Sequence, residues 1–240
     1  MPIDFPKFAG RIGLSQALLV VAPHPDDETL GCGGMIALAR ARGYDVAVVL
    51  VTDGSASHPD SITWPTARLA HQRHFELVAA LRVLGVDRPP ICLGLPDAQT
   101  QRLPAAEVAR AQNKLARAIE AYGPDAVFTT WRREPHCDHR FAYTVTRSAV
   151  LAQARAPALI EYMVWTPVTG TPQDFPQPAE TEQLSLDVEG VRDIKCAALT
   201  EHRSQLGHLI SDDPAGFTLT APQITAMTGP YEHFFLARTK

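Results

Sequence analysis

The chain has 240 residues, 45% of them hydrophobic, and a formal net charge of −4 at pH 7, which suits one α/β domain over residues 1–240. The slightly acidic balance argues against nucleic acid as the main partner, and no stretch approaches the roughly 18 apolar residues that span a membrane. The N-terminus lacks the apolar segment of a secretory signal, and four widely separated cysteines favour a reducing, cytoplasmic location over a disulfide framework.

Short apolar runs alternate with helical patterns along the first two thirds of the chain. Buried strands are predicted over residues 18–22, 46–51, 91–93, 126–130 and 159–164. Helices are predicted over 35–42, after a Gly-rich turn, and over 66–84, 104–122 and 139–153. Beyond them we expect an irregular excursion over 167–178, a helix over 188–206 and an edge strand over 232–236. This alternation predicts a Rossmann-like three-layer α/β fold with a mostly parallel central sheet.

Polar residues collect directly after four of the predicted strands. Residues 23–28 follow the first strand, Asp53 the second, Asp97 the third and residues 132–139 the fourth. In an open parallel sheet these loops emerge at the same carboxyl edge, where such folds bind ligands. The sequence therefore predicts one convergent active site at the carboxyl ends of the strands.

The first polar cluster has the composition of a metal site. His24, Asp26, Asp27 and Glu28 lie within one short loop, and adjacent carboxylates repel one another unless a cation or a shared proton relieves them. One histidine of the pair at positions 136 and 139, with His24 and one carboxylate, would supply three protein ligands. Three ligands and a water are the arrangement of catalytic zinc, and a remaining carboxylate could act as general base.

Other interpretations of these residues stay open at this stage. The acidic groups could stabilise the N-terminus of the following helix, and Cys137 could be a soft metal ligand or a small apolar filler. Glycines at positions 31, 33 and 34 with Asp53 imitate a dinucleotide-binding pattern. Against that pattern, Ile36 stands where the third glycine belongs, and the preceding carboxylates would repel a pyrophosphate.

Several segments match short motifs of one protein family. Residues 22–28 resemble an AHPDDE motif with one extra proline, and residues 136–139 resemble an HPDH motif with Cys137 in place of proline. Residues 195–205 resemble a KxxAxxxHxSQ pattern, and weaker matches surround Asp53, Arg73 and Asp97. Together the matches span about residues 18–206. On these motifs the chain resembles the PIG-L/LmbE-like family of zinc-dependent N-deacetylases.

The resemblance implies a role for each residue of the two main motifs. In that family the first histidine and second aspartate of AHPDDE and the second histidine of HPDH bind zinc, which implies His24, Asp27 and His139 as ligands. The first aspartate is the family's general base, which implies Asp26. The first histidine of HPDH stabilises the oxyanion or assists proton transfer, which implies His136.

By the same resemblance, Arg73 and Asp97 would contact substrate hydroxyls. The implied cofactor is Zn²⁺, with another divalent metal such as Fe²⁺ as the alternative. The implied enzyme is a hydrolase of linear amide C–N bonds, with a small N-acetylated, N-acetylglucosamine-type compound as its partner, and a homo-oligomer is compatible with the family. Two other functions stay open: an amidase acting on a different small amide, and a catalytically inactive metal- or sugar-binding protein. The loops over 55–65 and 167–178 would set the rest of the substrate.

Overall fold

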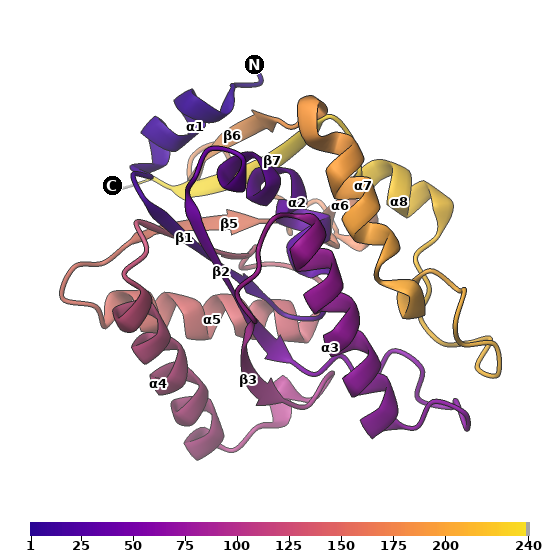
Figure 1. Cartoon of the computed structure of the whole chain (residues 1–240). Helices are drawn as coiled ribbons and strands as arrows, with labels where there is room; N and C mark the ends of the chain where they lie inside the picture. Colours follow the sequence, from indigo (N-terminus) through magenta and orange to yellow (C-terminus); the bar gives the residue numbers. More distant parts are fainter. Residues whose placement is uncertain (239–240) are drawn as a thin grey trace.

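A seven-stranded sheet forms the centre of the computed structural model, which describes residues 1–238 (Figure 1). The strands run in the order β3-β2-β1-β4-β5-β7-β6. The first five are parallel, whereas β7 is antiparallel to both of its neighbours. Their bounds are β1 Ala17–Ala22, β2 Asp45–Thr52, β3 Ile91–Leu95, β4 Ala126–Thr130, β5 Ala158–Tyr162, β6 Thr181–Asp187 and β7 Tyr231–Ala237.

Helices cover both faces of the sheet and give the expected three layers. One hydrophobic core lies against α1, α2, α3 and α7, and a second lies against α4 and α5. Alternate residues of β1 enter the two cores, so every residue from Leu18 to Ala22 is buried, which explains the continuous apolar run. The helices are α1 Phe5–Ile12, α2 Asp27–Arg40, α3 Thr66–Val83, α4 Ala105–Tyr122, α5 Cys137–Leu151, α6 Thr166–Thr169, α7 Arg192–Thr200 and α8 Ala221–Met227.

The predicted Gly-rich turn before residue 35 is wrong, because α2 already begins at Asp27. Its glycines allow close packing instead. A Cβ atom at Gly31 would lie 2.2 Å from Tyr162 Cδ2, and one at Gly34 would lie 2.6 Å from Val188 Cβ. The glycine pattern therefore serves helix packing and forms no phosphate-binding loop, which removes the dinucleotide interpretation.

The C-terminal third differs most from the prediction. The segment over 232–236 belongs to β7, which lies between β5 and β6 and is not an edge strand. The helix predicted over 188–206 is broken into a 3₁₀ turn at Glu189–Val191, helix α7 and a second 3₁₀ turn at Arg203–Gln205. The helix ends at Thr200 because the residues that follow α7 contact other elements, as His202 does with Glu28 of α2. Within α3, Phe75 is 63% exposed, so it lies outside the apolar face that the helical pattern over residues 66–84 predicts.

The strand order places the loop after β1 beside the loop after β4. β1 pairs with β2 on one side and with β4 on the other. Successive strands therefore add outward in one direction from β1 to β3 and in the opposite direction from β4 to β5. This is the switch point at which doubly wound sheets bind ligands.

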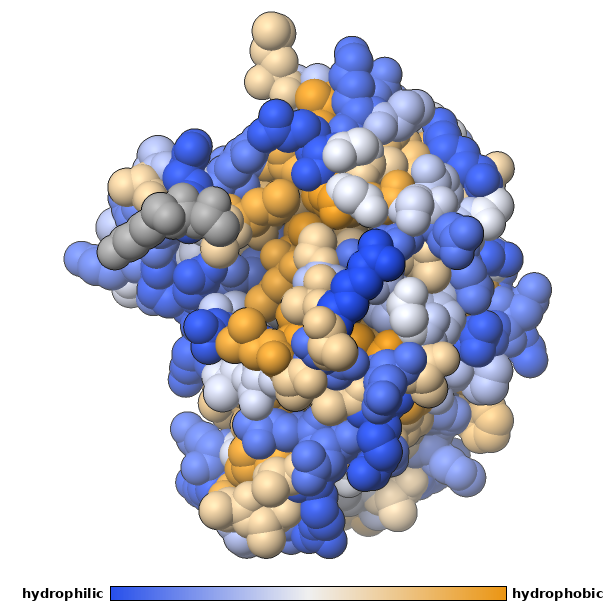
Figure 2. All heavy atoms as spheres, turned by 90° about the vertical axis from the view of Figure 1, so that its left-hand side faces the viewer, coloured by the Kyte–Doolittle hydropathy of each residue, from blue (hydrophilic) through white to orange (hydrophobic). Residues whose placement is uncertain are grey.

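Figure 2 shows the face on the left of Figure 1, where a band of apolar side chains lies among hydrophilic ones. None of the helices in residues 1–238 has the length and hydropathy needed to cross a bilayer.

Candidate metal centre and active site

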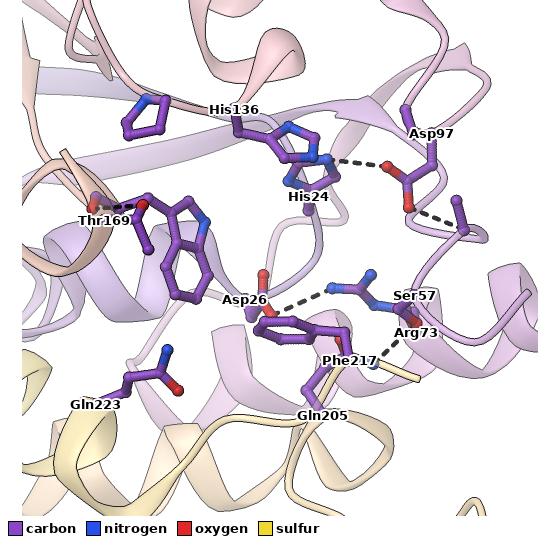
Figure 3. A pocket seen from close by; sticks show the side chains of 14 residues that line it. His24, Asp26, Ser57, Arg73, Asp97, His136, Thr169, Gln205, Phe217 and Gln223 are labelled. Carbon is purple, nitrogen blue, oxygen red and sulfur yellow. Dashed lines mark hydrogen bonds and ion pairs between the residues drawn. The ribbon is translucent and has the colours of Figure 1, made fainter. Parts of the chain in front are cut away.

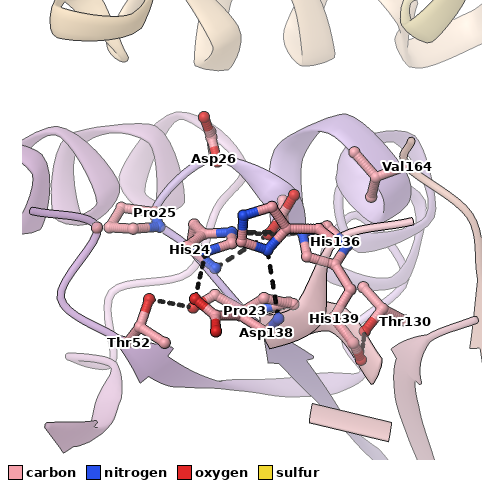
Figure 4. Close-up of polar contacts among 12 residues, drawn as sticks. Pro23, His24, Pro25, Asp26, Thr52, Thr130, His136, Asp138, His139 and Val164 are labelled. Atoms are coloured by element: carbon pink, nitrogen blue, oxygen red, sulfur yellow. Dashed lines mark hydrogen bonds and ion pairs between the residues drawn. The ribbon is translucent and has the colours of Figure 1, made fainter. Parts of the chain in front are cut away.

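Three side chains bring one ligand atom each to a common point at the switch between β1 and β4 (Figure 4). His24 Nδ1 lies 3.2 Å from Asp27 Oδ2 and 3.3 Å from His139 Nε2, and the last two atoms lie 3.2 Å apart. Ligand atoms at about 2.0–2.1 Å from a tetrahedral zinc lie about 3.3 Å from one another. The triangle therefore has the size that a bound zinc requires.

Carboxylates contact the other ring nitrogen of both histidines. His24 Nε2 lies 3.0 Å from Asp97 Oδ1 and 3.1 Å from Asp138 Oδ2, and His139 Nδ1 lies 3.1 Å from Glu134 Oε2. Such contacts keep the ring proton on the outer nitrogen and leave the inner nitrogen free to bind a metal. Asp138 stands inside the HPDH-like motif, but the sequence carried no signal for the role of Glu134.

The cluster is buried and rich in negative charge. Burial lowers the pKa of His24, but hydrogen bonds to Asp138, Asp27 and Asp97 outweigh it and raise that pKa well above its ordinary value. In the same way, Asp27 and Glu134 overcome the effect of burial and raise the pKa of His139 to about 9. Both shifts reflect an excess of buried carboxylate charge, which a divalent cation would compensate. Charge and donor set together fit a metal ion.

Asp26 lies beside the triangle with its side chain facing a cavity (Figure 3). Its backbone has φ 147° and ψ −27°, a region that non-glycine residues rarely adopt. Arg73 Nη2 donates to Asp26 Oδ2 at 3.2 Å and to the Pro25 carbonyl at 2.9 Å. Burial raises the pKa of Asp26 to about 6, although the charge of Arg73 opposes this. A carboxyl group with a pKa near neutrality is suited to general-base work.

His136 lines the same cavity from the N-terminus of α5. Its Nδ1 accepts a hydrogen bond from the Asp138 backbone N–H at 3.3 Å, which leaves the proton of a neutral ring on Nε2. Burial, together with the neighbouring His24 and His139, lowers the pKa of His136 to about 4. The ring is therefore neutral near pH 7, and its Nε2–H can donate a hydrogen bond to a developing oxyanion.

The cavity has a volume of about 440 Å³, within the ~300–1,000 Å³ typical of small-molecule sites. The predicted loops contribute only in part, through Ala56 and Ser57 from the first and Thr169 from the second. Trp165, Phe217 and other residues of the C-terminal third complete the wall and were not predicted. The full lining is His24, Asp26, Ala56, Ser57, Arg73, Asp97, Ala98, Pro135, His136, Trp165, Thr169, Gln205, Phe217 and Gln223.

The two predicted substrate-binding residues make contacts within the protein. Arg73 holds Asp26 and donates from Nη1 to the Gly54 carbonyl at 2.8 Å. Asp97 contacts His24 and accepts from the Ala56 backbone N–H at 2.9 Å. Both also line the cavity, so their contact with substrate hydroxyls stays a prediction.

The KxxAxxxHxSQ-like segment joins the C-terminal third to the site. Lys195 Nζ donates to the Leu30 carbonyl at 2.9 Å, in α2, and lies 2.7 Å from Glu232 Oε1. His202 Nε2 lies 3.3 Å from Glu28 Oε1. The segment was recognised as a motif, but its function of fixing α2 and the first loop became visible only in the structure.

The sequence matches a known protein family and known proteins. A family model described as PIG-L, GlcNAc-PI de-N-acetylase, matches residues 19–150. A 1D-myo-inositol 2-acetamido-2-deoxy-alpha-D-glucopyranoside deacetylase of Mycobacteroides abscessus is 30% identical to this chain, over 93% of the chain and 92% of that protein.

Solved structures share the fold. The N,N'-diacetylchitobiose deacetylase of Pyrococcus horikoshii matches with a TM-score of 0.64 and 24% identity, over 79% of this chain and 70% of that one. GalB, the 4-carboxy-2-hydroxymuconate hydratase of Pseudomonas putida KT2440, matches with a TM-score of 0.62 and 19% identity, over 94% and 97%. Because this fold hosts a hydratase as well, the reaction must be argued from the site and the sequence relatives. The family match, which covers more than half of the chain, and the relative matched over nearly its whole length show that this chain belongs to the PIG-L family of N-deacetylases.

Proposed function

We propose that this chain is a zinc-dependent hydrolase that removes an N-acyl group, acetyl above all, from a small N-acetylglucosamine-type substrate. The observation that carries the proposal is the triangle of His24, Asp27 and His139 with the Asp26 carboxylate beside it at one end of the cavity. The Mycobacteroides relative is named as a deacetylase of a 2-acetamido-2-deoxy-glucopyranoside, which supports the same substrate class.

In this proposal His24, Asp27 and His139 hold the metal, with Fe²⁺ as the alternative to zinc. When bound, the metal would polarise the amide carbonyl and lower the pKa of water towards about 7. Asp138 and Asp97 orient His24, and Glu134 orients His139, so that the ligand nitrogens face one another.

Asp26 is the general base. It takes a proton from the water that attacks the amide carbonyl, and Arg73 keeps its carboxylate turned towards the cavity. His136 Nε2–H donates a hydrogen bond to the oxyanion of the tetrahedral intermediate, an interaction typically worth about 3 kcal/mol. Asp26 then passes its proton to the leaving nitrogen, and the C–N bond breaks to give acetate and a free amine.

A panel of N-acyl glucosamines tests the proposed activity. Acetate release from N-acetylglucosamine compounds, falling as the acyl chain lengthens, would support it. Faster release of longer acyl groups would favour the amidase alternative. Saturable binding of the sugar without any release would favour the inactive binding protein.

Three broader expectations remain proposals. The cysteines at positions 32, 92, 137 and 196 are all free thiols, which supports a reducing, cytoplasmic location. A single domain over residues 1–240 and a homo-oligomer remain predictions, checked by limited proteolysis and light scattering.

A further inference from the structure

We infer that the outer faces of α3 and α7 form an interface between two copies of this chain, related by a two-fold axis. Each copy places its α3 against the α7 of the other copy. Within one copy the two helices lie side by side over the same hydrophobic core (Figure 1). Their outer faces carry exposed apolar side chains and charges of opposite sign. The inference concerns association of the chain and does not depend on the proposed catalytic activity.

The first observation is an apolar stripe along the outer face of α3. Phe75, Ala79 and Val83 are spaced four residues apart, so they follow one another along one side of the helix. Phe75 is 63% exposed, Val83 is 36% exposed, and Ala79 between them is half-buried. A single exposed apolar side chain is ordinary, but a contiguous patch of them marks a surface that another molecule covers.

α7 adds a second apolar surface beside α3. Ile194 is 40% exposed, and Ala197, one turn further along, is exposed as well. The inner side of α7 packs into the core through Ala198 and Leu199, so the outer side is left without a partner helix among residues 1–238. Because Ala197 is small, a helix of another molecule can approach α7 closely at this point.

The charges on the outer face of α3 are positive. Arg68 and Arg82 are exposed on this helix. Its one acidic residue, Glu76, is buried and accepts hydrogen bonds from the backbone N–H and Oγ of Ser204. The surface that α3 offers to a partner is therefore basic as well as apolar.

The charges on the outer face of α7 are negative. Asp193 is exposed and Glu201, directly after the helix, is half-buried. The basic residues of α7 are already engaged, because Arg192 Nε donates to the Thr228 carbonyl at 2.7 Å and Lys195 is buried against Glu232. The surface that α7 offers is therefore acidic.

None of the four outer charges, at positions 68, 82, 193 and 201, makes an ion pair within residues 1–238. A two-fold axis running between α3 and α7 brings the basic helix of each copy onto the acidic helix of the other, so both contacts form at once. Pairing α3 with α3 would oppose arginine with arginine. The charge pattern therefore selects the crossed arrangement.

The same pattern argues against nucleic acid or an anionic lipid surface as the occupant. A uniformly negative surface attracts α3 but repels α7, which lies beside it. A second copy of the chain satisfies both helices and covers both apolar surfaces.

Sedimentation equilibrium of the purified full-length chain over a range of concentrations tests the inference. We expect a monomer–dimer equilibrium whose Kd rises with added salt, because salt screens the charges across the interface. A monomer at every concentration measured would overturn the inference.

Phe75→Ser tests the apolar part of the interface. The variant should raise the dimer Kd by about 100-fold, because a two-fold interface loses the same contact twice. Leu151→Ser is the matched control: Leu151 is also 63% exposed, but it ends α5, which packs against the other core, and its loss should leave the Kd unchanged. An unchanged Kd in Phe75→Ser would overturn the interface.

A mixing experiment tests the crossed arrangement of α3 and α7. Arg82→Glu sets acidic charge on α3 against the acidic α7, and Asp193→Lys sets basic charge on α7 against the basic α3. Each variant alone should therefore dimerise about tenfold more weakly than the wild type. In an equimolar mixture the two altered helices attract each other and the two unaltered helices do the same, so a heterodimer should form with a Kd near that of the wild type.

Arg117→Glu is the control for the mixture, because Arg117 is exposed on α4, which packs against the other core. It should not restore association when mixed with Asp193→Lys. Circular dichroism of each variant confirms that it is folded before mixing. A mixture of folded Arg82→Glu and Asp193→Lys that associates no better than either variant alone would overturn the pairing of α3 with α7.

Discussion

Glu28 accepts a hydrogen bond from the backbone N–H of Asp26, with its Oε2 atom 3.1 Å from that nitrogen. The other oxygen of Glu28 lies 3.3 Å from His202 Nε2 and accepts from Thr29 Oγ1 at 2.6 Å. Asp26 has a positive φ of 147°, and this contact is one of those that hold it there. Glu28 thus links the C-terminal motif to the orientation of the proposed base.

Replacing Glu28 with glutamine should lower kcat more than it changes KM. The amide cannot accept from both Asp26 and Thr29 as the carboxylate does, and a misplaced base can cost about 100-fold in rate. Steady-state kinetics with a parallel zinc determination checks this. The matched control is Glu107→Gln on the surface of α4, which should behave as wild type. Unchanged kcat in Glu28→Gln would show that Asp26 does not depend on this contact.

Asp26→Asn should bind zinc but lose nearly all turnover. Asparagine keeps the shape of the side chain and cannot take a proton, and general-base catalysis contributes about 10²–10⁴-fold. Metal analysis and acetate release measure the two properties on the same sample. Full activity in this variant would refute the assignment of the base.

His139→Ala should lose the metal as well as the activity. The substitution removes one corner of the ligand triangle and leaves Glu134 without its histidine partner, and Asp27 with His24 alone, in a buried site. His208→Ala, at an exposed position, serves as the control that should retain both metal and activity. Stoichiometric zinc in His139→Ala would exclude its role as a ligand.

Gly31→Ala should destabilise the fold through overpacking. The new Cβ atom would lie 2.2 Å from Tyr162 Cδ2, and forced core contacts typically cost about 1–3 kcal/mol. The free energy of unfolding, measured by denaturant titration, reports the effect. Gly10→Ala is the matched helix control, because its Cβ atom would meet nothing within 4 Å. Equal stability of both variants would contradict the packing role of Gly31.

Local patterns predicted the parts of the molecule that depend on nearby residues. The buried run of β1 and the polar residues after β1 and β4 were enough to predict the sheet and the convergence of its loops. The strand β6, in which polar and apolar residues alternate, and the break after α7 were missed because they depend on partners far along the chain.

The same limit applies to the site. His24 and Asp26 stand in a recognisable motif, and the structure brings both to the predicted edge. Two other features depend on tertiary packing: the orienting contact of Glu134 with His139, and the edge-to-face contact of Trp165 with Phe217. Neither leaves a periodicity or a residue spacing that can be recognised in a single sequence.

The most direct test of the central claim is metal content together with acetate release, measured before and after chelation on the purified protein. We predict about one zinc per chain, loss of acetate release when the metal is removed, and recovery when zinc is returned. Acetate release that persists in metal-free protein, or a purified protein that binds no divalent metal, would contradict the claim.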